Sequence, residues 1–229
     1  QVDSAIRNLD AVSVNINYSN QSKTILDNSF NLNISSNMLS AMSDLFISLS
    51  GTELKADQVN LYDFSGYVLE AGISTIVKKT DGSKDEWIEV ARELEGKKVL
   101  TPPYCTREYT KTATYDQWFI SLYRSFNNQY KRGVGVIETA KQCKSVFKSI
   151  ITYKKKDHED AASIYVFDSN GDLIYPYDIS QEYKAALQPY YELTKGDDSA
   201  LTFISPLTGK TEYAAEALSL IHISEPTRL

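Results

Sequence analysis

One local pattern occurs twice in this chain and constrains its fold more than any other feature. It runs QVNLYDFSGYVLEAG at 58–72 and SIYVFDSNGDLIYPYD at 163–178, each time as a short strand, a polar turn and a second short strand. When Asp63 is aligned with Asp168, Gly66 matches Gly171 once one extra turn residue is allowed. Asp and Asn hydrogen-bond their own backbone and Gly accepts a positive φ, so both stretches predict a β-hairpin.

The elements after each hairpin repeat as well. The first hairpin is followed by a helical pattern at 85–95, strands at 118–126 and 133–139, and a helical pattern at 140–151. The second is followed by a helix that Ser180 caps and Pro189 bends or breaks, and then by a strand, a turn and a strand over 199–215. The stretch 97–117 is rich in aromatics and interrupted by paired prolines, so we expect loop there. The chain is therefore predicted to be α+β, with two similar units built on antiparallel strands.

The N-terminal 50 residues have a helical period instead. Val2, Ile6, Leu9 and Ile16 share one face of a first helix, and a stripe of Met and other apolar residues marks a second helix at 38–49. We expect the Met stripe to be core packing, and the narrow apolar face of the first helix to be available for packing against a second copy of the chain.

These patterns divide the chain into four parts. We expect a helical stalk at 1–50, a first domain at 51–153 and a second domain at 154–217, with the charged run KKKDHED at the junction. The last segment, 218–229, does not continue the pattern and resembles translated sequencing adaptor. We therefore expect 218–229 to be a non-native tail and the second domain to be truncated.

Composition excludes several classes of function. The net charge is −6, which does not favour a nucleic-acid groove, and no apolar run approaches the roughly 20 residues needed to cross a membrane. The chain contains 2 His, and no metal-ligand spacing, Gly-rich phosphate loop or Ser/His/Asp set stands out. We therefore expect no catalytic residues, no metal and no cofactor, and we expect this chain not to be an enzyme.

The two cysteines, Cys105 and Cys143, leave two possibilities open. They can form a disulfide in an extracytoplasmic setting, or they can be two separately buried thiols.

The order of these elements resembles a known family. A long N-terminal helix, the unit from Gln58 to Ile151 and the hairpin YVFDSNGDLIY together resemble the double Cache sensors of bacterial transmembrane receptors. The strands and helix in WFISLYRSF and GVGVIETAKQCKSVF are similar to the sensor regions of YesM-type histidine kinases of Gram-positive bacteria. The resemblance implies a helical stalk followed by two tandem PAS-like (Cache) domains, of which the first is distal to the membrane.

The resemblance also implies a small-molecule site in the distal domain. Such a site combines aromatic walls with a few fixed polar groups, and the stretch 102–123 supplies that mixture. Arg107 is a candidate for a ligand carboxylate, and Tyr104, Trp118 and Tyr123 are candidates for stacking and hydrogen bonding. Strand parity places Trp118 and Tyr123 on opposite faces, so we expect at most one of them to line a given pocket unless the strand is bulged.

The expected function is extracytoplasmic sensing for a membrane-bound histidine kinase. The expected partners are a sugar, an amino acid or another small carboxylate as ligand, and a second copy of the chain in a homodimer. We expect no nucleic-acid partner, and membrane attachment only through flanking segments. Two alternatives stay open: the sensor of a chemotaxis receptor, and a secreted solute-binding or adhesion protein.

Overall fold

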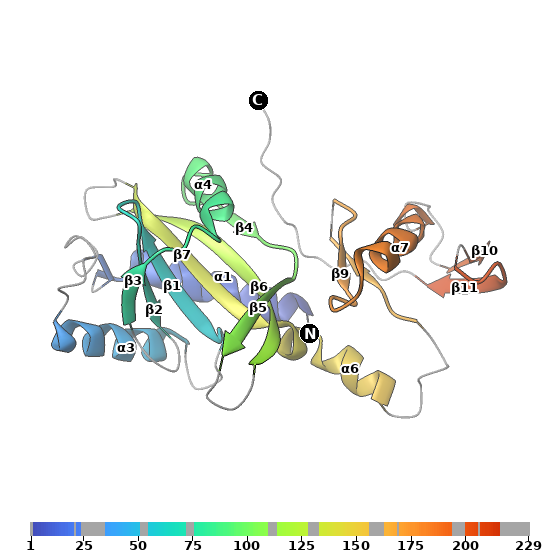
Figure 1. The fold of residues 1–229 in the computed structure, drawn as a ribbon, viewed down its shortest axis with the longest axis horizontal. Helices are drawn as coiled ribbons and strands as arrows, with labels where there is room; N and C mark the ends of the chain where they lie inside the picture. Colours follow the sequence, from blue (N-terminus) through green and yellow to red (C-terminus); the bar gives the residue numbers. More distant parts are fainter. Residues whose placement is uncertain are drawn as a thin grey trace.

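A seven-stranded antiparallel sheet forms the centre of the computed structural model (Figure 1). Its strand order is β3-β2-β1-β7-β6-β4. Strand β5 also pairs with β6, along a different part of β6 from β4. The structure describes residues 2–20, 22–23, 35–50, 55–71, 76–109, 114–127, 133–155, 163–168, 170–193, 200–205 and 207–215. The predicted tail at 218–229 and most of the charged run at 154–160 lie outside these residues.

The strands of the sheet alternate between two buried faces. Their bounds are β1 Gln58–Asp63, β2 Tyr67–Ala71, β3 Ile76–Lys79, β4 Lys98–Leu100, β5 Tyr104–Tyr109, β6 Thr114–Asn127 and β7 Gly133–Gln142. β7 lies between β1 and β6, and both of its faces are covered. At Gly135 a Cβ atom would lie 2.2 Å from the Tyr62 carbonyl oxygen, so only glycine fits between these two strands.

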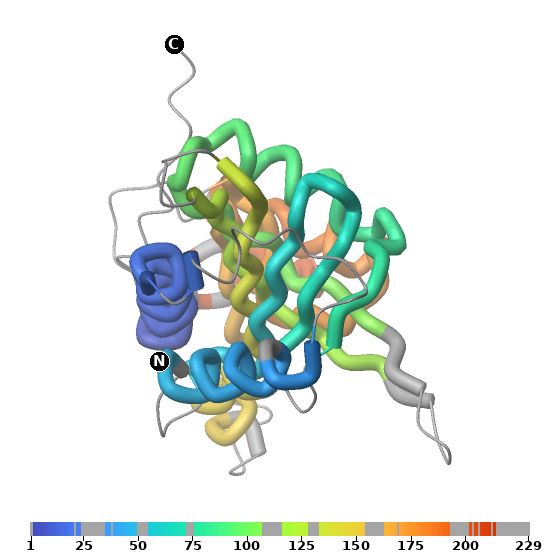
Figure 2. The backbone as a smooth tube through the Cα atoms, turned by 90° about the vertical axis from the view of Figure 1, so that its left-hand side faces the viewer, coloured from blue at the N-terminus to red at the C-terminus, as the bar shows by residue number. Residues whose placement is uncertain are grey.

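One face of the sheet packs against the N-terminal helices. Helix α1 (Val2–Tyr18) buries Ile6, Leu9 and Ile16 against sheet residues such as Ile120 and Leu122. Helix α3 (Ser36–Ser50) adds Met42 and Phe46 to the same core, which confirms the core role predicted for these two residues of the stripe, while the Met38 side chain lies outside the described residues. Figure 2 shows α1 and α3 against this side of the sheet.

The apolar face of α1 is therefore used inside the chain. Leu9 and Ile16 are fully buried, so the prediction that this face is available for a second copy of the chain is wrong. The physical reason is that the same stripe covers the apolar face of the sheet, which would otherwise be exposed to water. A long free-standing stalk is not seen in the described part of 1–50.

The opposite face of the sheet is covered by α4 (Asp85–Glu93). Ile88 and Ala91 of this helix pack on Tyr62, Tyr123 and Val136, which project from β1, β6 and β7. The helix ends before Gly96, whose φ of 94° is the left-handed conformation that stops a helix. This confirms the helix predicted at 85–95.

The stretch expected to be loop contains two strands. β4 and β5 both pair with β6, and the prolines at 102 and 103 lie between them, outside either ladder. The prediction was wrong because proline interrupts a strand without preventing strands on either side of it. The helix expected at 140–151 also begins later, since β7 extends to Gln142 before α5 (Cys143–Val146) and α6 (Lys148–Lys155). The boundary expected after residue 153 falls within α6.

The second hairpin forms, but its strands are short. β8 (Val166–Phe167) pairs with β9 (Leu173–Tyr175), and the Asp168 carboxylate accepts hydrogen bonds from the backbone of Asn170 and Asp172. Asp168 therefore serves the turn, as predicted. Helix α7 (Gln181–Leu193) starts at Ser180, whose hydroxyl accepts from the Tyr183 amide at 3.2 Å, and it continues through Pro189.

The last described elements are β10 (Ala200–Ile204) and β11 (Thr211–Ala215), which pair with each other as predicted. Within the described residues, β8–β9 and β10–β11 are two separate two-stranded sheets. Tyr175 of the second hairpin belongs to the same core as α1 and the large sheet. The structure thus supports a mixed α and β fold on an antiparallel sheet, but not a second sheet equivalent to the first.

Candidate ligand site

A buried carboxylate lies at the centre of the α4-covered face of the sheet. Glu138 of β7 has no exposed side-chain surface. Its nearest neighbours along the strand are apolar or small, in the sequence VIETA. A buried carboxylate is costly unless it is paired and hydrogen-bonded, so its partners define the site.

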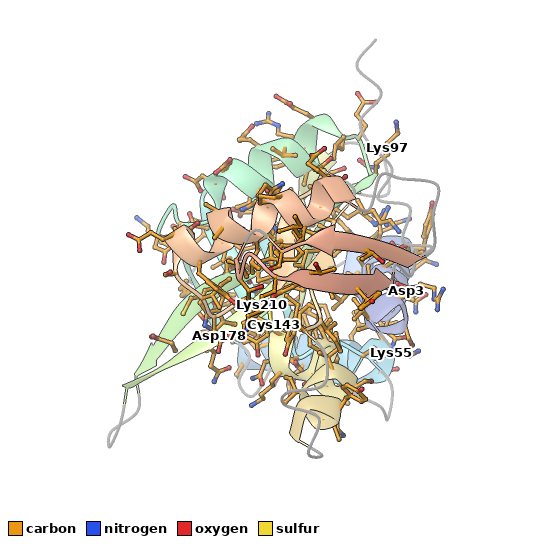
Figure 3. The ribbon with its side chains drawn as sticks, turned by 90° about the vertical axis from the view of Figure 1, so that its right-hand side faces the viewer. Asp3, Lys55, Lys97, Cys143, Asp178 and Lys210 are labelled. Carbon is orange, nitrogen blue, oxygen red and sulfur yellow. The ribbon has the colours of Figure 1, made fainter. Side chains whose placement is uncertain are left out.

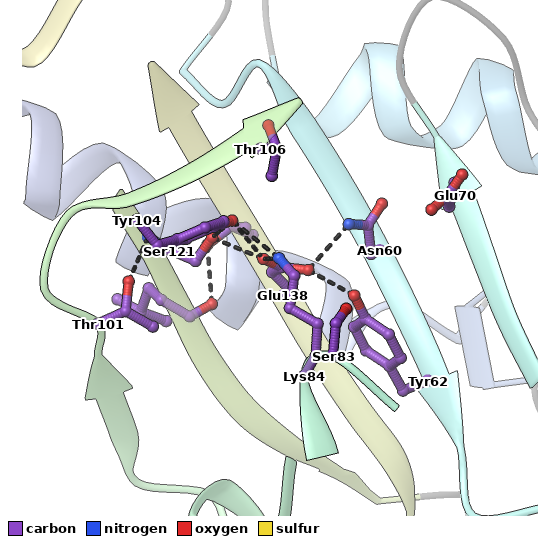
Figure 4. A network of polar contacts seen from close by, with 12 residues as sticks. Asn60, Tyr62, Glu70, Ser83, Lys84, Thr101, Tyr104, Thr106, Ser121 and Glu138 are labelled. Atoms are coloured by element: carbon purple, nitrogen blue, oxygen red, sulfur yellow. Dashed lines mark hydrogen bonds and ion pairs between the residues drawn. The ribbon is translucent and has the colours of Figure 1, made fainter. Parts of the chain in front are cut away.

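Five side chains donate hydrogen bonds to Glu138 (Figure 4). Its Oε2 atom accepts from Asn60 Nδ2 at 2.9 Å and from the Tyr62 hydroxyl at 2.7 Å. Its Oε1 atom accepts from Lys84 Nζ at 2.8 Å, the Tyr104 hydroxyl at 3.0 Å and Ser121 Oγ at 2.6 Å. These donors come from β1, the start of α4, β5 and β6, so the sheet and α4 build the site together. We call these six residues the Glu138 cluster.

The pairing register of the strands brings the cluster residues on β1, β6 and β7 next to one another. Asn60 lies opposite Glu138 in the β1–β7 pair, and Tyr123 lies opposite Glu138 in the β6–β7 pair. Ser121 is two residues from Tyr123 on β6 and therefore shares its face. The Ser121 amide donates to Thr101 Oγ1 at 3.0 Å, which fixes the segment between β4 and β5 against β6.

Charge inside the cluster is balanced. Burial raises the pKa of Glu138, but the Lys84 ammonium and hydrogen bonds from Lys84, Ser121 and Asn60 outweigh it and lower this pKa to about 2. The same carboxylate acts oppositely on the tyrosines: burial, and then the Glu138 charge, raise the pKa values of Tyr62 and Tyr104 far above the usual range. Glu138 is thus an anion and the tyrosines are neutral donors at physiological pH.

Two of the predicted site residues lie in or beside this cluster. The Tyr104 hydroxyl donates to Glu138 and accepts from Lys84 Nζ at 2.9 Å, and its oxygen lies 2.7 Å from Ser121 Oγ. Tyr123 is fully buried and stacks on Tyr62 with ring centroids 6.4 Å apart. Its hydroxyl is buried without a hydrogen-bond partner among the described residues. A buried hydroxyl left unpaired is costly, so the Tyr123 hydroxyl can donate to a bound polar group; burial, and then the nearby Glu138 charge, raise its pKa far above the usual range and keep it protonated.

The other two predicted residues are not brought into the cluster. Trp118 lies on the opposite face of β6 and contacts Tyr177, with ring centroids 5.8 Å apart. The opposition of Trp118 and Tyr123 is what strand parity predicted. The Arg107 backbone pairs with Asp116 in the β5–β6 ladder, and its side chain lies outside the described residues. The ligand roles predicted for the four residues stay predictions.

The sequence analysis missed Glu138, Lys84, Asn60, Tyr62 and Ser121. One signal for Glu138 was present, because a single charged residue inside an apolar strand requires a partner. No local signal identified that partner, since Lys84 lies 54 positions away in the chain.

The cysteines do not form a disulfide. Cys143 is buried and Cys105 is exposed, so neither the disulfide nor the pair of buried thiols is found. Figure 3 shows Cys143 inside the fold. Among the described residues, no three or more His, Cys, Asp or Glu side chains lie together in a way that could hold a metal ion.

The fold is similar to that of bacterial sensory domains. The periplasmic sensory domain of the Campylobacter jejuni chemoreceptor Tlp1 matches with a TM-score of 0.54 and 14% identity, over 93% of this chain and 83% of that one. The Campylobacter jejuni Tlp3 sensory domain with isoleucine bound matches with a TM-score of 0.51 and 15% identity, over 94% and 85%. The extracellular domain of the putative histidine kinase vpHK1S-Z8 matches with a TM-score of 0.54 and 12% identity, over 86% and 74%.

Sequence comparison does not extend this result. No family model matches the chain, and no curated protein matches it significantly. The likeness to these solved structures, which are sensory domains of chemoreceptors and of a histidine kinase, concerns the fold. No described helix is long and apolar enough to span a membrane.

Proposed function

We propose that this chain is the extracytoplasmic sensor domain of a membrane-bound receptor, and that its ligand binds at the Glu138 cluster. The observation that carries the proposal is a buried, fully bonded carboxylate beside the unpaired hydroxyl of Tyr123. A core needs neither feature for stability, since a well-packed apolar residue would serve equally well there. The fold supports the same proposal, because solved domains of this fold are sensory.

The proposed ligand is a small polar molecule: an amino acid, a sugar or another small carboxylate. The Tlp3 sensory domain of the same fold has been solved with isoleucine bound, which supports the amino-acid class. The remaining N–H of Lys84 and the Tyr123 hydroxyl beside the cluster are donors, and Tyr104 and Tyr123 add two aromatic rings, which suit any of the three classes. We propose Tyr104 and Tyr123 as ligand contacts, and we keep Arg107 as a candidate for a ligand carboxylate. In this proposal the chain carries no catalytic activity of its own.

The proposed receptor is a two-component histidine kinase of the YesM type. The likeness of 118–126 and 133–147 to YesM-type sensors supports this choice, and the vpHK1S-Z8 neighbour is compatible with it. A chemotaxis receptor is the second candidate, because Tlp1 matches equally well. The flanking gene sequence separates the candidates: a downstream kinase domain supports the first, a chemotaxis signalling domain the second, and a stop codon after a secreted sensor contradicts both.

The proposed signal is a displacement of helix α1. Arg124 of β6 donates to Asp10 and Ser13 of α1 and to the Gly96 carbonyl after α4. Thr139, next to Glu138 on β7, donates to the Leu9 carbonyl of α1 at 3.2 Å. A ligand that moves α4 or β7 therefore acts on α1 through directly bonded groups. The proposed homodimer would use a surface other than the buried stripe of α1, and light scattering of the purified chain tests it.

Thermal melting against a panel of sugars, amino acids and small carboxylates tests the proposed function. We expect at least one compound to raise the melting temperature in a saturable way, because a ligand that binds only the folded chain stabilises it. Tyr104→Phe and Tyr123→Phe should weaken that response, and so should Arg107→Ala if its side chain contacts the ligand. Tyr213→Phe is the matched control, since Tyr213 is 86% exposed on β11. A panel without any response contradicts direct ligand sensing.

A further inference from the structure

Lys84 occupies a position where its helix does not favour lysine. It is the N-cap residue of α4, and it makes no side-chain capping bond. N-cap positions prefer Ser, Thr, Asp or Asn, whose side chains accept a hydrogen bond from the first turn. The helix dipole also disfavours a positive charge at this end. The reason for lysine at this position therefore lies outside α4.

The Lys84 side chain is directed toward the sheet instead. Its Nζ atom donates to Glu138 Oε1 at 2.8 Å and to the Tyr104 hydroxyl at 2.9 Å, and it lies 4.2 Å from the centroid of the Tyr104 ring. One of its three N–H groups has no partner among the described residues. The side chain is 21% exposed, whereas that of Glu138 is not exposed at all. Lys84 is thus the boundary between the buried carboxylate and solvent.

The carboxylate has no capacity for a further donor. It already accepts five hydrogen bonds, three of them at Oε1, so the roughly four lone-pair sites of a carboxylate are all occupied and two donors at Oε1 share a site. The donors on strands are held by the ladder, and Lys84 alone among the five lies outside the sheet, on a flexible four-carbon stem. A free cation can therefore reach Glu138 only by taking the place of the Lys84 ammonium.

Tethering makes that replacement unfavourable. A group attached through a short flexible chain is present at an effective concentration on the order of millimolar or higher. A free primary ammonium ion would form the same hydrogen bonds to Glu138 and Tyr104 and would gain nothing over Lys84. It would have to exceed that effective concentration, or make further contacts, to compete.

We propose that Lys84 determines the specificity of this site by filling its cation position, so that small primary ammonium groups are kept away from Glu138. This inference rests on the proposed function, which makes the Glu138 cluster the ligand site. The groups left for a ligand are the third N–H of Lys84 and the Tyr123 hydroxyl, each of which can donate to an oxygen acceptor such as a carbonyl, a hydroxyl or a carboxylate. An amino acid that binds here places its oxygen end, not its ammonium, at the cluster.

Chemical rescue with methylammonium tests the assignment. Lys84→Met keeps most of the stem and removes the ammonium, so it opens the cation position beside a buried anion. We expect this variant to melt below the wild type, and methylammonium chloride to raise its melting temperature saturably by several degrees. Tetramethylammonium chloride should not do so, because it has the charge but no N–H donor. The wild type and Lys78→Met should not respond, since Lys78 pairs with Glu70 at the surface.

The outcomes separate this inference from the proposed function. If Lys84→Met is unfolded, recovery of its far-UV circular dichroism by methylammonium supports the assignment and lack of recovery overturns it. Equal responses of the wild type and Lys84→Met to methylammonium also overturn it. Adding Glu138→Gln to Lys84→Met should abolish the response. The ligand panel uses the wild type, so a silent panel together with rescue of Lys84→Met rejects the sensing function but not the role of Lys84.

Discussion

The indole of Trp118 and the phenol ring of Tyr177 are in contact, with centroids 5.8 Å apart and planes inclined by 48°. Phe147 completes the group, at 5.8 Å from Tyr177 and 5.0 Å from Tyr175. Trp118 belongs to β6 and Tyr177 follows β9, so residues before and after the charged run at 154–160 form one aromatic cluster. The adjacent residue Phe119 stacks on Tyr104 of the Glu138 cluster. The candidate ligand site and the second hairpin are therefore joined through Trp118 and Phe119 of β6.

A double-mutant cycle measures this contact. Trp118→Leu and Tyr177→Leu should each lower the free energy of unfolding, and their combination should show a coupling of about 0.5–1.5 kcal/mol, the range found for aromatic pairs. Urea denaturation provides the measurement. The control cycle pairs Trp118→Leu with Tyr213→Leu, where effects should add because Tyr213 is exposed. Strict additivity of the Trp118 and Tyr177 variants would show that the rings are not energetically coupled.

Arg124 should contribute more to stability than other arginines of the chain. Its side chain is 12% exposed and its guanidinium bonds Asp10, Ser13 and the Gly96 carbonyl, so Arg124→Met removes three charge-assisted contacts. We expect a loss on the order of 2–3 kcal/mol in urea denaturation, since hydrogen bonds to charged groups contribute most. Arg124→Lys should recover only part of it, because an ammonium cannot span the three acceptors.

Arg92→Met provides the comparison for Arg124. Its ion pair with Glu89 is 3.6 Å long and both side chains are more than half exposed, so we expect a loss within about 1 kcal/mol. If Arg124→Met costs no more than Arg92→Met, α1 is not held to the sheet through Arg124. The proposed signal path would then lose its main support.

A feature of the fold could be predicted from the sequence when the residues that determine it are neighbours in the chain. The hairpin turns, the Ser180 cap and the end of α4 depend on neighbouring residues, and all of them were predictable from local patterns. The pairing of β4 and β5 with β6 was not, because two prolines masked the strands on either side of them. The same limit applied to α1, since the sequence shows an apolar stripe but not the surface that covers it.

The candidate site was predictable only in part for the same reason. Tyr104 was found because the stretch 102–123 has the composition of a ligand site. The stretch also suggested Trp118, which the pleat of β6 directs to the other face. Glu138 and Lys84 meet only because β1, β6, β7 and α4 converge, and no local pattern encodes that convergence. A buried charge in a strand indicates that a partner exists, but the fold determines which residue it is.

Lowering the pH should remove the stabilisation that the Glu138–Lys84 ion pair gives to the folded chain. The pKa of Glu138 in the folded chain is about 2, below the usual glutamate value of 4.5, so the contribution of this group is fully present above about pH 4.5 and is lost as pH falls toward 2. The difference corresponds to a contribution on the order of 3 kcal/mol. Glu138→Gln should therefore be less stable than the wild type at pH 7 and show a smaller loss between pH 4.5 and 2. Urea denaturation across this range tests it, and parallel pH profiles of the two proteins would contradict it.

The two cysteines should differ strongly in reactivity. The thiolate is the reactive form, and burial raises the pKa of Cys143 to about 12, whereas Cys105 lies exposed on β5. A thiol-specific reagent at pH 8 should therefore modify one thiol per folded chain quickly and the second only after unfolding. Cys105→Ser should abolish the fast phase and Cys143→Ser should leave it intact. Rapid modification of Cys143 in the folded chain would show that the α5 region opens readily, and the packing of Phe147 against Tyr175 and Tyr177 would then be weaker than the ring contacts indicate.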